Sequence, residues 1–189
     1  MRYVNHISEV LYIKRILGQV RKAIQDFDMI QEGDRIAIGV SGGKDSLTLL
    51  LALRKLMDFY PKRFELEAVT INILNCNKVA LAHNRDDAIE TLLMSTFYEG
   101  RIYTFSPVTY LARTQLHVIR PLVYVEEKRI KALVRQRNLQ IVQNPCKANG
   151  RTKRQYFKQL LLDMSKDNRE VKSNLFGAIL RSGLEGWHK

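Results

Sequence analysis

The feature that most constrains this chain is a short polar loop, rich in glycine, that follows an apolar run. The loop reads Ser41-Gly42-Gly43-Lys44-Asp45-Ser46. The run before it, residues 36–40, is short and mostly β-branched, as is typical of a buried parallel strand. After the loop, leucines recur on one side of a predicted helix. The sequence therefore predicts a strand, a tight turn and a helix N-terminus in direct succession.

This succession of elements makes a site for an anion. Adjacent glycines let the backbone turn tightly and approach a ligand, and the free N–H groups of the first helical turn point toward it. Lys44 adds a mobile positive charge. A surface turn followed by an Asp or Ser cap is the structural alternative, but it leaves the lysine and both glycines unexplained. We therefore expect residues 41–46 to bind phosphate.

The loop does not match the two commonest phosphate-binding patterns. The Walker pattern requires glycine where Ile38 stands and Ser or Thr where Asp45 follows the lysine. The dinucleotide pattern G-x-G-x-x-G also fails, because Ser41 and Lys44 stand where it requires glycine. An aspartate inside a phosphate loop would repel the ligand unless a divalent cation lies between them. Asp45 thus points to a metal–polyphosphate ligand.

Composition limits the classes of protein. The 189 residues suffice for one domain with a proper core, and no stretch approaches the ~18 apolar residues of a membrane span. The N-terminus lacks the apolar region of a secretion signal, so we expect a cytoplasmic protein without membrane contact. Two cysteines do not make a disulfide framework.

The net charge of +12 is concentrated in one part of the chain. From Lys128 to Lys158 there are ten Lys and Arg residues and no Asp or Glu, with Tyr156 and Phe157 interleaved. Such a field attracts polyanions, and phosphate neutralisation supplies most of the non-specific affinity for nucleic acid. A solvated basic face of two helices is the alternative. Next to a phosphate loop, we interpret the stretch as an RNA-binding surface.

The periodicity of apolar residues predicts an α/β fold with a parallel sheet flanked by helices. Helices are expected at 7–27, 45–59, 86–98, 126–138, 152–165 and 169–182. Strands are expected at 36–40, 64–73 and 78–83, with an extended segment at 118–125 and a short strand at 141–142. We expect an N-terminal helical segment (1–30), a nucleotide-binding domain (31–145) and a basic helical extension (146–189).

One connection in this scheme is too short. Parallel strands need a crossover of a dozen or more residues, but only residues 74–77 separate the second and third predicted strands. Either these strands form an antiparallel hairpin or the sequence omits a segment near residues 72–77. We favour omission. In that case the omitted segment contains the crossover helix, and Cys76 packs at the end of that helix.

A second polar cluster lies where the third predicted strand ends and a helix begins, the usual place for ligand groups in an open α/β sheet. It runs from Leu81 to Thr91. Asn84 is expected to cap the helix, with Asp87 completing a capping box. Adjacent carboxylates also suit Mg²⁺, so Asp86 and Asp87 are candidate metal ligands. His83 is expected to pack near the nucleotide.

The hexapeptide S-G-G-K-D-S resembles the signature of the PP-loop ATP pyrophosphatases, which split ATP into AMP and pyrophosphate. The stretches LAHNRDDAIETLLMSTFYEGR, IRPLVYVEEKRI and NPC resemble, within that superfamily, the enzymes that make 2-thiocytidine in tRNA. The resemblance covers about residues 20–160. It implies a three-layer α/β sandwich of the adenine-nucleotide α-hydrolase type. It also implies ATP, Mg²⁺ and tRNA as ligands, with the loop residues and His83 at the nucleotide.

In that family, ATP adenylates the C2 carbonyl oxygen of a cytidine, and a sulfur donor protein or sulfide then displaces AMP. The resemblance implies catalytic roles for Lys44, Asp45 and Asp87, and relatives often form a homodimer. Family members also hold a [4Fe–4S] cluster by a C-x-x-C pair and a later cysteine, which Cys146 matches. The pair is absent from this sequence, so a role of Cys146 as a cluster ligand is conditional on the omitted segment.

Other functions fit parts of the sequence. A tRNA lysidine synthetase shares the loop and the H-x-x-D-D-x-x-E-T cluster but does not need Cys146. An ATP pyrophosphatase with a small-molecule acceptor, or a non-catalytic ATP-binding module, has little use for the basic stretch. ATP cleavage that requires tRNA would separate the RNA enzymes from these last two classes.

Overall fold

The structure is a computed structural model that describes residues 2–69, 76–142 and 152–188. Its helices are α1 (Arg2–Asp26), α2 (Lys44–Leu56), α3 (Arg85–Glu99), α4 (Glu127–Gln136), α5 (Lys153–Asp167) and α6 (Val171–Arg181). Its strands are β1 (Asp34–Gly39), β2 (Phe64–Val69), β3 (Lys78–Ala80), β4 (Val108–Leu111) and β5 (Leu116–Ile119). Within these described ranges, no helix is both long and apolar enough to cross a bilayer.

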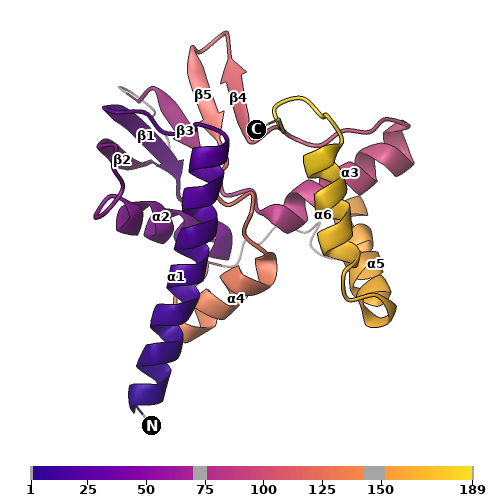
Figure 1. Ribbon diagram of the computed structural model, residues 1–189, viewed down its shortest axis with the longest axis horizontal. Helices are drawn as coiled ribbons and strands as arrows, with labels where there is room; N and C mark the ends of the chain where they lie inside the picture. Colours follow the sequence, from indigo (N-terminus) through magenta and orange to yellow (C-terminus); the bar gives the residue numbers. More distant parts are fainter. Residues whose placement is uncertain (1, 70–75, 143–151, 189) are drawn as a thin grey trace.

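The five strands form one mixed sheet in the order β2-β1-β3-β5-β4 (Figure 1). All neighbours pair in parallel except β4 and β5, which form an antiparallel hairpin at one edge. The parallel α/β fold expected from the sequence is thus confirmed, but the hairpin was not anticipated. The predicted extended segment 118–125 is wrong in its second half, because the chain enters a turn at Pro121 instead of continuing the strand.

The connection between β2 and β3 is the unusual part of the sheet. Both strands lie parallel to β1 on opposite sides of it, so the hairpin alternative is wrong. Val69 ends β2 level with Gly39, and Lys78 begins β3 level with Ile36. Only residues 70–77 separate these two strands in sequence, far fewer than a crossover helix needs. Residues 70–75 lie outside the described part, so the omitted segment stays a prediction.

The helices form two groups (Figure 1). Helices α1, α2 and α4 contact one another beside the sheet, and α3, α5 and α6 form a second group. One hydrophobic core joins the two, with Ile16 of α1, Ile38 of β1, Leu53 of α2 and Ile179 of α6 among its members. Side chains from the predicted N-terminal segment and C-terminal extension therefore share the core of the central domain. The boundaries at residues 30 and 145 stay a prediction.

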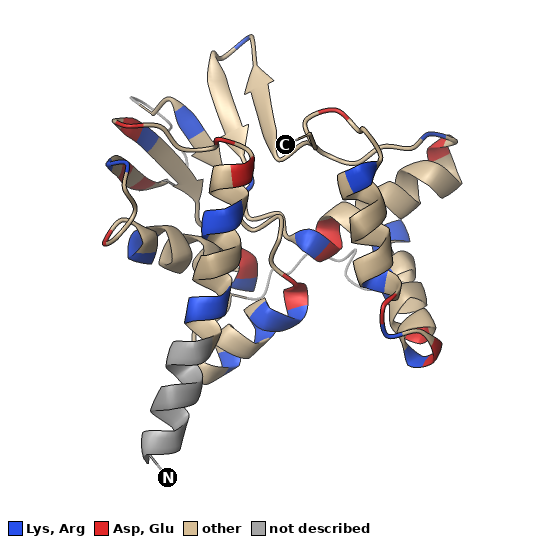
Figure 2. Ribbon diagram, in the orientation of Figure 1, with Lys and Arg blue, Asp and Glu red and all other residues tan. Residues whose placement is uncertain are grey.

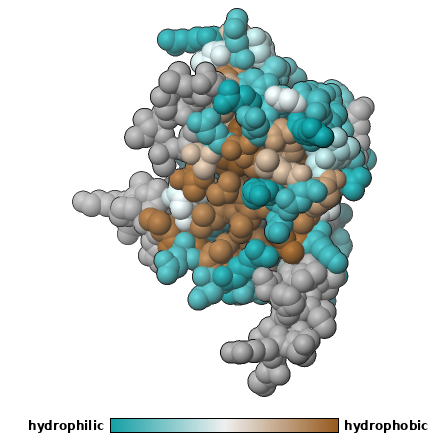
Figure 3. Space-filling model, turned by 90° about the vertical axis from the view of Figure 1, so that its left-hand side faces the viewer, coloured by the Kyte–Doolittle hydropathy of each residue, from teal (hydrophilic) through white to brown (hydrophobic). Residues whose placement is uncertain are grey.

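Charged residues of both signs gather where the N-termini of α3 and α4 meet, near the middle of the molecule (Figure 2). The side on which α2 and β2 lie has a different character, with a broad apolar area bordered by polar residues (Figure 3). Leu50 of α2 and Leu66 of β2 are only partly buried, as is Met57 directly after α2. Phe59, just after α2, is 53% exposed. The molecule thus has a charged region near its middle and an incompletely covered apolar surface on the side of α2 and β2.

Candidate nucleotide-binding site

The glycine loop adopts the strand–turn–helix geometry predicted from the sequence. Helix α2 begins at Lys44 with Gly43 as its N-cap residue, and no side chain caps its first amides. The Ser46 hydroxyl donates to the Gly43 carbonyl oxygen at 3.0 Å and lies 3.2 Å from the hydroxyl of Ser41. The loop therefore closes on itself and leaves helix N–H groups for a ligand.

Gly42 occupies a position that other residues would not tolerate. Its φ is +72°, and a Cβ atom built on it would lie 2.8 Å from Cγ2 of Val142. The Val142 amide also donates to the Gly42 carbonyl oxygen at 3.1 Å. Residues 141–142 are irregular rather than the predicted strand, because their contact is with the loop and not with the sheet. The segment after α4 thus packs against the phosphate loop.

Lys44 lies between two carboxylates. Its ammonium nitrogen is 2.7 Å from Oδ2 of Asp45 and 3.2 Å from Oε1 of Glu127. Burial works against the charge of Lys44, but the hydrogen bonds and charges of Asp45 and Glu127 outweigh it and raise the pKa. Lys44 is therefore a cation that is already directed toward oxygen ligands.

The predicted capping box at the start of α3 is confirmed. The Asn84 side-chain oxygen accepts from the amides of Asp86 and Asp87, and the Asn84 amide donates to Oδ2 of Asp87 at 2.9 Å. The Asn84 side-chain nitrogen also donates to Oδ1 of Asp45 at 3.3 Å, a contact that the sequence did not predict. The structure thereby joins the glycine loop to the second polar cluster.

Asp86 and Asp87 have different surroundings although they are adjacent. The buried carboxylate of Asp86 is 2.7 Å from the Lys172 ammonium and accepts the Glu127 amide at 2.7 Å. Both of its oxygens thus link α3 to α4 and α6. Asp87 instead directs Oδ1 toward Arg154, at 3.1 Å. Its position is closer to what a ligand-binding carboxylate requires.

Arg154 of α5 connects three residues of α3. One guanidinium nitrogen is 3.1 Å from Asp87 and 3.4 Å from Glu90, and the other donates to the Thr91 hydroxyl at 3.3 Å. Burial raises the pKa of Asp87 despite these contacts. Burial and the neighbouring Asp87 charge raise the pKa of Glu90 to about 7. One arginine is therefore not enough to neutralise this pair of acids.

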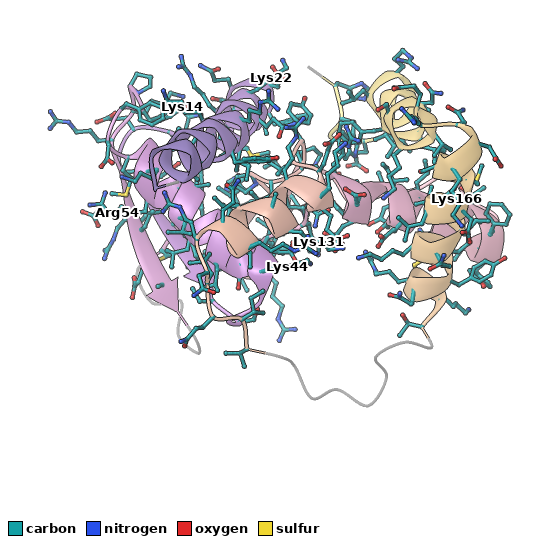
Figure 4. All side chains as sticks on the ribbon, turned by 90° about the horizontal axis from the view of Figure 1, so that it is seen from below. Lys14, Lys22, Lys44, Arg54, Lys131 and Lys166 are labelled. Atoms are coloured by element: carbon teal, nitrogen blue, oxygen red, sulfur yellow. The ribbon has the colours of Figure 1, made fainter. Side chains whose placement is uncertain are left out.

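Glu127, the first residue of α4, is the centre of a lysine cluster that the sequence did not reveal. Its Oε1 is 2.7 Å from Lys158 and its Oε2 is 3.0 Å from Lys131, in addition to the contact with Lys44. Burial opposes ionisation of Glu127, but hydrogen bonds from Lys158 and Lys131 outweigh it and lower the pKa to about 2. Figure 4 shows Lys44 and Lys131 near each other beside α4.

These groups line a common cavity of about 210 Å³. Its lining comes from α2, α3, α4 and α5, together with the residues that precede two of these helices. The charged members are Lys44, Asp86, Asp87, Glu90, Glu127, Arg154 and Lys158. The cavity thus brings the predicted lysine and aspartates together with three residues, Glu127, Arg154 and Lys158, whose sequence neighbourhood gave no sign of this role.

His83 packs against an aromatic side chain and, in the described part of the chain, makes no hydrogen bond with the loop. Its ring stacks on Phe105 with centroids 4.8 Å apart. Burial lowers the pKa of His83 to about 4, and the charges of Arg120 and Arg154 act in the same direction, so the ring is neutral at pH 7. Within the described residues, its buried Nδ1 has no hydrogen-bond partner. The expected proximity of His83 to the nucleotide stays a prediction.

Of the two cysteines, only Cys76 lies in the described part of the chain. Cys146 lies outside the described residues. The Cys76 thiol donates to Oε2 of Glu67 at 3.3 Å, and burial raises its pKa. In the described part of the chain, no three His, Cys, Asp or Glu side chains are arranged to hold a metal ion.

A helix-opening glycine loop with a directed lysine, at the carboxyl ends of parallel strands, defines a nucleotide-binding α/β protein. A family model described as a PP-loop domain matches residues 61–164. The tRNA-cytidine(32) 2-sulfurtransferase of Geobacter sulfurreducens is 32% identical over 235 residues, covering 92% of this chain and 91% of that protein. The enzyme of the same name from Syntrophotalea carbinolica is 32% identical over 88% of this chain and 87% of its own.

The chain therefore belongs to the PP-loop proteins and, among them, to the family of the tRNA-cytidine(32) 2-sulfurtransferases. Among solved structures it is similar to the U34-tRNA thiolase NcsA from Methanococcus maripaludis with its [4Fe-4S] cluster. The TM-score is 0.69 at 16% identity, and the match covers 94% of this chain and 81% of that one. This second likeness supports the fold. The family resemblance found in the sequence is thus confirmed.

Proposed function

We propose that this protein thiolates a cytidine in tRNA at the expense of ATP, which it splits into AMP and pyrophosphate. The observation that carries the proposal is the position of Lys44. It stands at the open N-terminus of α2, in contact with Asp45 and Glu127, in a chain of the sulfurtransferase family.

The first step makes a leaving group. The C2 carbonyl oxygen of cytidine attacks the α-phosphorus of ATP, an O–P bond forms, and the bond to pyrophosphate breaks. The departing pyrophosphate gains negative charge, which the amides of α2 and the ammonium of Lys44 stabilise. Asn84 holds Asp45 beside this lysine, so the loop is organised before the ligand binds.

The second step replaces oxygen by sulfur. A sulfur nucleophile attacks C2, the C–O bond to the adenylate breaks, AMP leaves with that oxygen, and the proton on sulfur passes to solvent or a nearby base. We propose that the nucleophile is hydrosulfide, either free in solution or released by a sulfur donor protein. We also propose that the protein forms a homodimer, which light scattering of the purified protein would test.

Mg²⁺ is the cation that the donor set supports. Carboxylate oxygens are its usual protein ligands, and it binds together with phosphates. Burial raises the pKa of Asp87, and burial together with the charge of Asp87 raises that of Glu90, so a bound cation would favour the ionised form of both carboxylates. Asp87 and Asp45 would hold the ion, which supplies charge neutralisation for the triphosphate. Asp86 is less suited, because its side chain is only 7% exposed whereas that of Asp87 is 26% exposed.

An aromatic and basic surface at the junction of α3 and α5 fits single-stranded RNA. Phe97, Tyr98 and Tyr156 are 69%, 50% and 60% exposed, and each contacts the buried ring of Phe157. The Lys153 ammonium lies 4.1 Å from the centroid of Tyr98. Unstacked bases of an RNA loop bind to such rings, while lysines contact the backbone. A tRNA substrate would also place the protein in the cytoplasm.

A [4Fe–4S] cluster does not fit the residues present. A three-cysteine site needs one more cysteine than Cys76 and Cys146, and Cys76 is hydrogen-bonded to Glu67. The cluster role of Cys146 therefore stays conditional on an omitted C-x-x-C segment, and no step above depends on it.

Two observations support the proposed omission of an internal segment. The alignment with the Geobacter sulfurreducens enzyme spans 235 residues, more than the 189 of this chain, so it contains gaps in this sequence. The side that carries β2 and α2 is also incompletely covered (Figure 3). Sequencing the gene and its transcript across codons 70–77 tests this directly: additional in-frame codons support the omission, and an uninterrupted reading frame of the given sequence contradicts it.

The test of the proposed function is the dependence of ATP cleavage on tRNA. Purified protein is incubated with radiolabelled ATP, sulfide and either unmodified tRNA or no RNA, and AMP is quantified. We expect AMP and pyrophosphate to form only with tRNA, and 2-thiocytidine to appear in it. Lysidine in place of 2-thiocytidine would identify the alternative ligase, and AMP formation without RNA would indicate a small-molecule acceptor.

A further inference from the structure

Two lysines from distant parts of the chain converge on a single oxygen atom. The ammonium of Lys44, in the phosphate loop, is 3.2 Å from Oε1 of Glu127, and that of Lys158, on α5, is 2.7 Å from the same atom. The side chains of both lysines are 27% exposed, and that of Glu127 is 9% exposed. The oxygen therefore marks a sheltered point where one negative charge is stabilised by two cations.

The charge balance at this point favours a further anion. A third lysine, Lys131, contacts the other oxygen of Glu127 at 3.0 Å, so three ammonium groups share one carboxylate. Among these three lysines, only Lys44 has another acid of the described residues within salt-bridge distance, which is Asp45. The strongly lowered pKa of Glu127 reflects this excess of positive charge. A phosphate oxygen between Lys44 and Lys158 would therefore meet two cations that the Glu127 carboxylate neutralises only in part.

We propose that Lys158 is a second polyphosphate-binding residue of the ATP site. When ATP binds, a phosphate oxygen takes the place of Glu127 Oε1 between Lys44 and Lys158, and Glu127 keeps Lys131 through its other oxygen. The proposal rests on the proposed function only in that ATP is the ligand. It assigns this lysine of the basic stretch to ATP rather than to tRNA.

The position of Lys158 on α5 supports this assignment. It lines the same cavity as Lys44 and Asp87. Arg154, one helical turn earlier on the same face, also points to acids of this cavity. Tyr156, between them in sequence, is instead 60% exposed. One face of α5 thus closes the ATP site, and another presents the aromatic residues expected to contact RNA.

The test compares two affinities in three variants. Lys158→Met removes the charge, Lys158→Arg keeps it, and Lys166→Met removes a charge from the same helix. Lys166 is 75% exposed, pairs with Asp163 and lies on α5 away from Lys44 (Figure 4). ATP affinity is measured with Mg²⁺ by calorimetry in the absence of RNA, tRNA affinity by filter binding without ATP, and folding by thermal melting.

We expect Lys158→Met to weaken ATP binding about tenfold, the loss of one charge-assisted hydrogen bond, with tRNA affinity changed by less than about twofold. Lys158→Arg should restore most of the ATP affinity, and Lys166→Met should leave it unchanged. Weaker tRNA binding with normal ATP binding would overturn the proposal. If Lys158→Met does not fold, Lys158→Arg decides the question. A Lys158→Arg variant that melts like the wild type but has lost its ATP affinity would contradict the proposal. Because no thiolation is measured, these results are independent of whether tRNA proves to be the substrate.

Discussion

The side-chain nitrogen of Asn84 donates to Oδ1 of Asp45 at 3.3 Å and so connects the two motifs of the site. The same amide group caps α3 through its oxygen. One residue thus fixes the start of a helix and the orientation of a loop aspartate. A substitution that preserves the helix cap but not the contact with Asp45 can therefore show the effect of each role by itself.

We predict that Asn84→Ala destabilises the protein by about 1 kcal/mol, the cost of a lost N-cap, and also lowers the rate of ATP cleavage. Asn84→Asp retains a capping oxygen but places a second carboxylate beside Asp45. It should therefore keep most of the stability and still weaken ATP binding. Urea denaturation and ATP titration of both variants check this. Equal ATP affinity in Asn84→Asp and the wild type would show that the contact with Asp45 has no part in binding.

Gly42→Ala should abolish ATP binding. An alanine at φ +72° costs about 1 to 2 kcal/mol, and its Cβ would collide with Val142, which lies 2.8 Å from that position. Gly39→Ala is the matched control, since it has a negative φ and nothing within 4 Å of the added atom. ATP affinity measured by calorimetry should be lost in the first variant and kept in the second. Normal binding by Gly42→Ala would contradict the described loop conformation.

The two adjacent aspartates should separate in their effects. Asp86→Asn is expected to lower stability by about 2 to 3 kcal/mol, because Lys172 loses its ionic partner, without changing the Mg²⁺ concentration needed for ATP cleavage. Asp87→Asn should raise that Mg²⁺ requirement with a smaller loss of stability. Mg²⁺ titrations of ATP cleavage and thermal melts of both variants measure this. The opposite assignment would follow if Asp86→Asn alone shifted the Mg²⁺ dependence.

Glu90 should make stability depend on pH. Its pKa is raised from 4.5 to about 7 in the folded protein, so the native state binds a proton that the unfolded chain has released. The contribution of this group therefore falls as pH rises from about 4.5 to 7. Glu90→Gln should remove this decline, which denaturant unfolding at pH 5 and pH 8 will show. An identical pH dependence in wild type and variant would mean that Glu90 ionises normally.

Much of the site could be predicted because its determinants are local. The phosphate loop needs a strand, two glycines and a lysine in succession, and the cap at Asn84 needs only a residue three positions later. Glu127, Arg154 and Lys158 act through contacts between helices that are far apart in sequence, so no local pattern identifies them. Likewise, the β4–β5 hairpin has half-exposed residues and a weak alternation, and its pairing depends on β5 being placed beside β3.

The most direct test of the whole account is the 2-thiocytidine content of tRNA from the source organism. Nucleosides from bulk tRNA of the wild type, a gene deletion, and deletions complemented with the wild-type gene or Lys44→Ala are analysed by mass spectrometry. We predict that 2-thiocytidine is lost on deletion, restored by the wild-type gene and not restored by Lys44→Ala. An unchanged nucleoside profile in the deletion strain would contradict the proposed function.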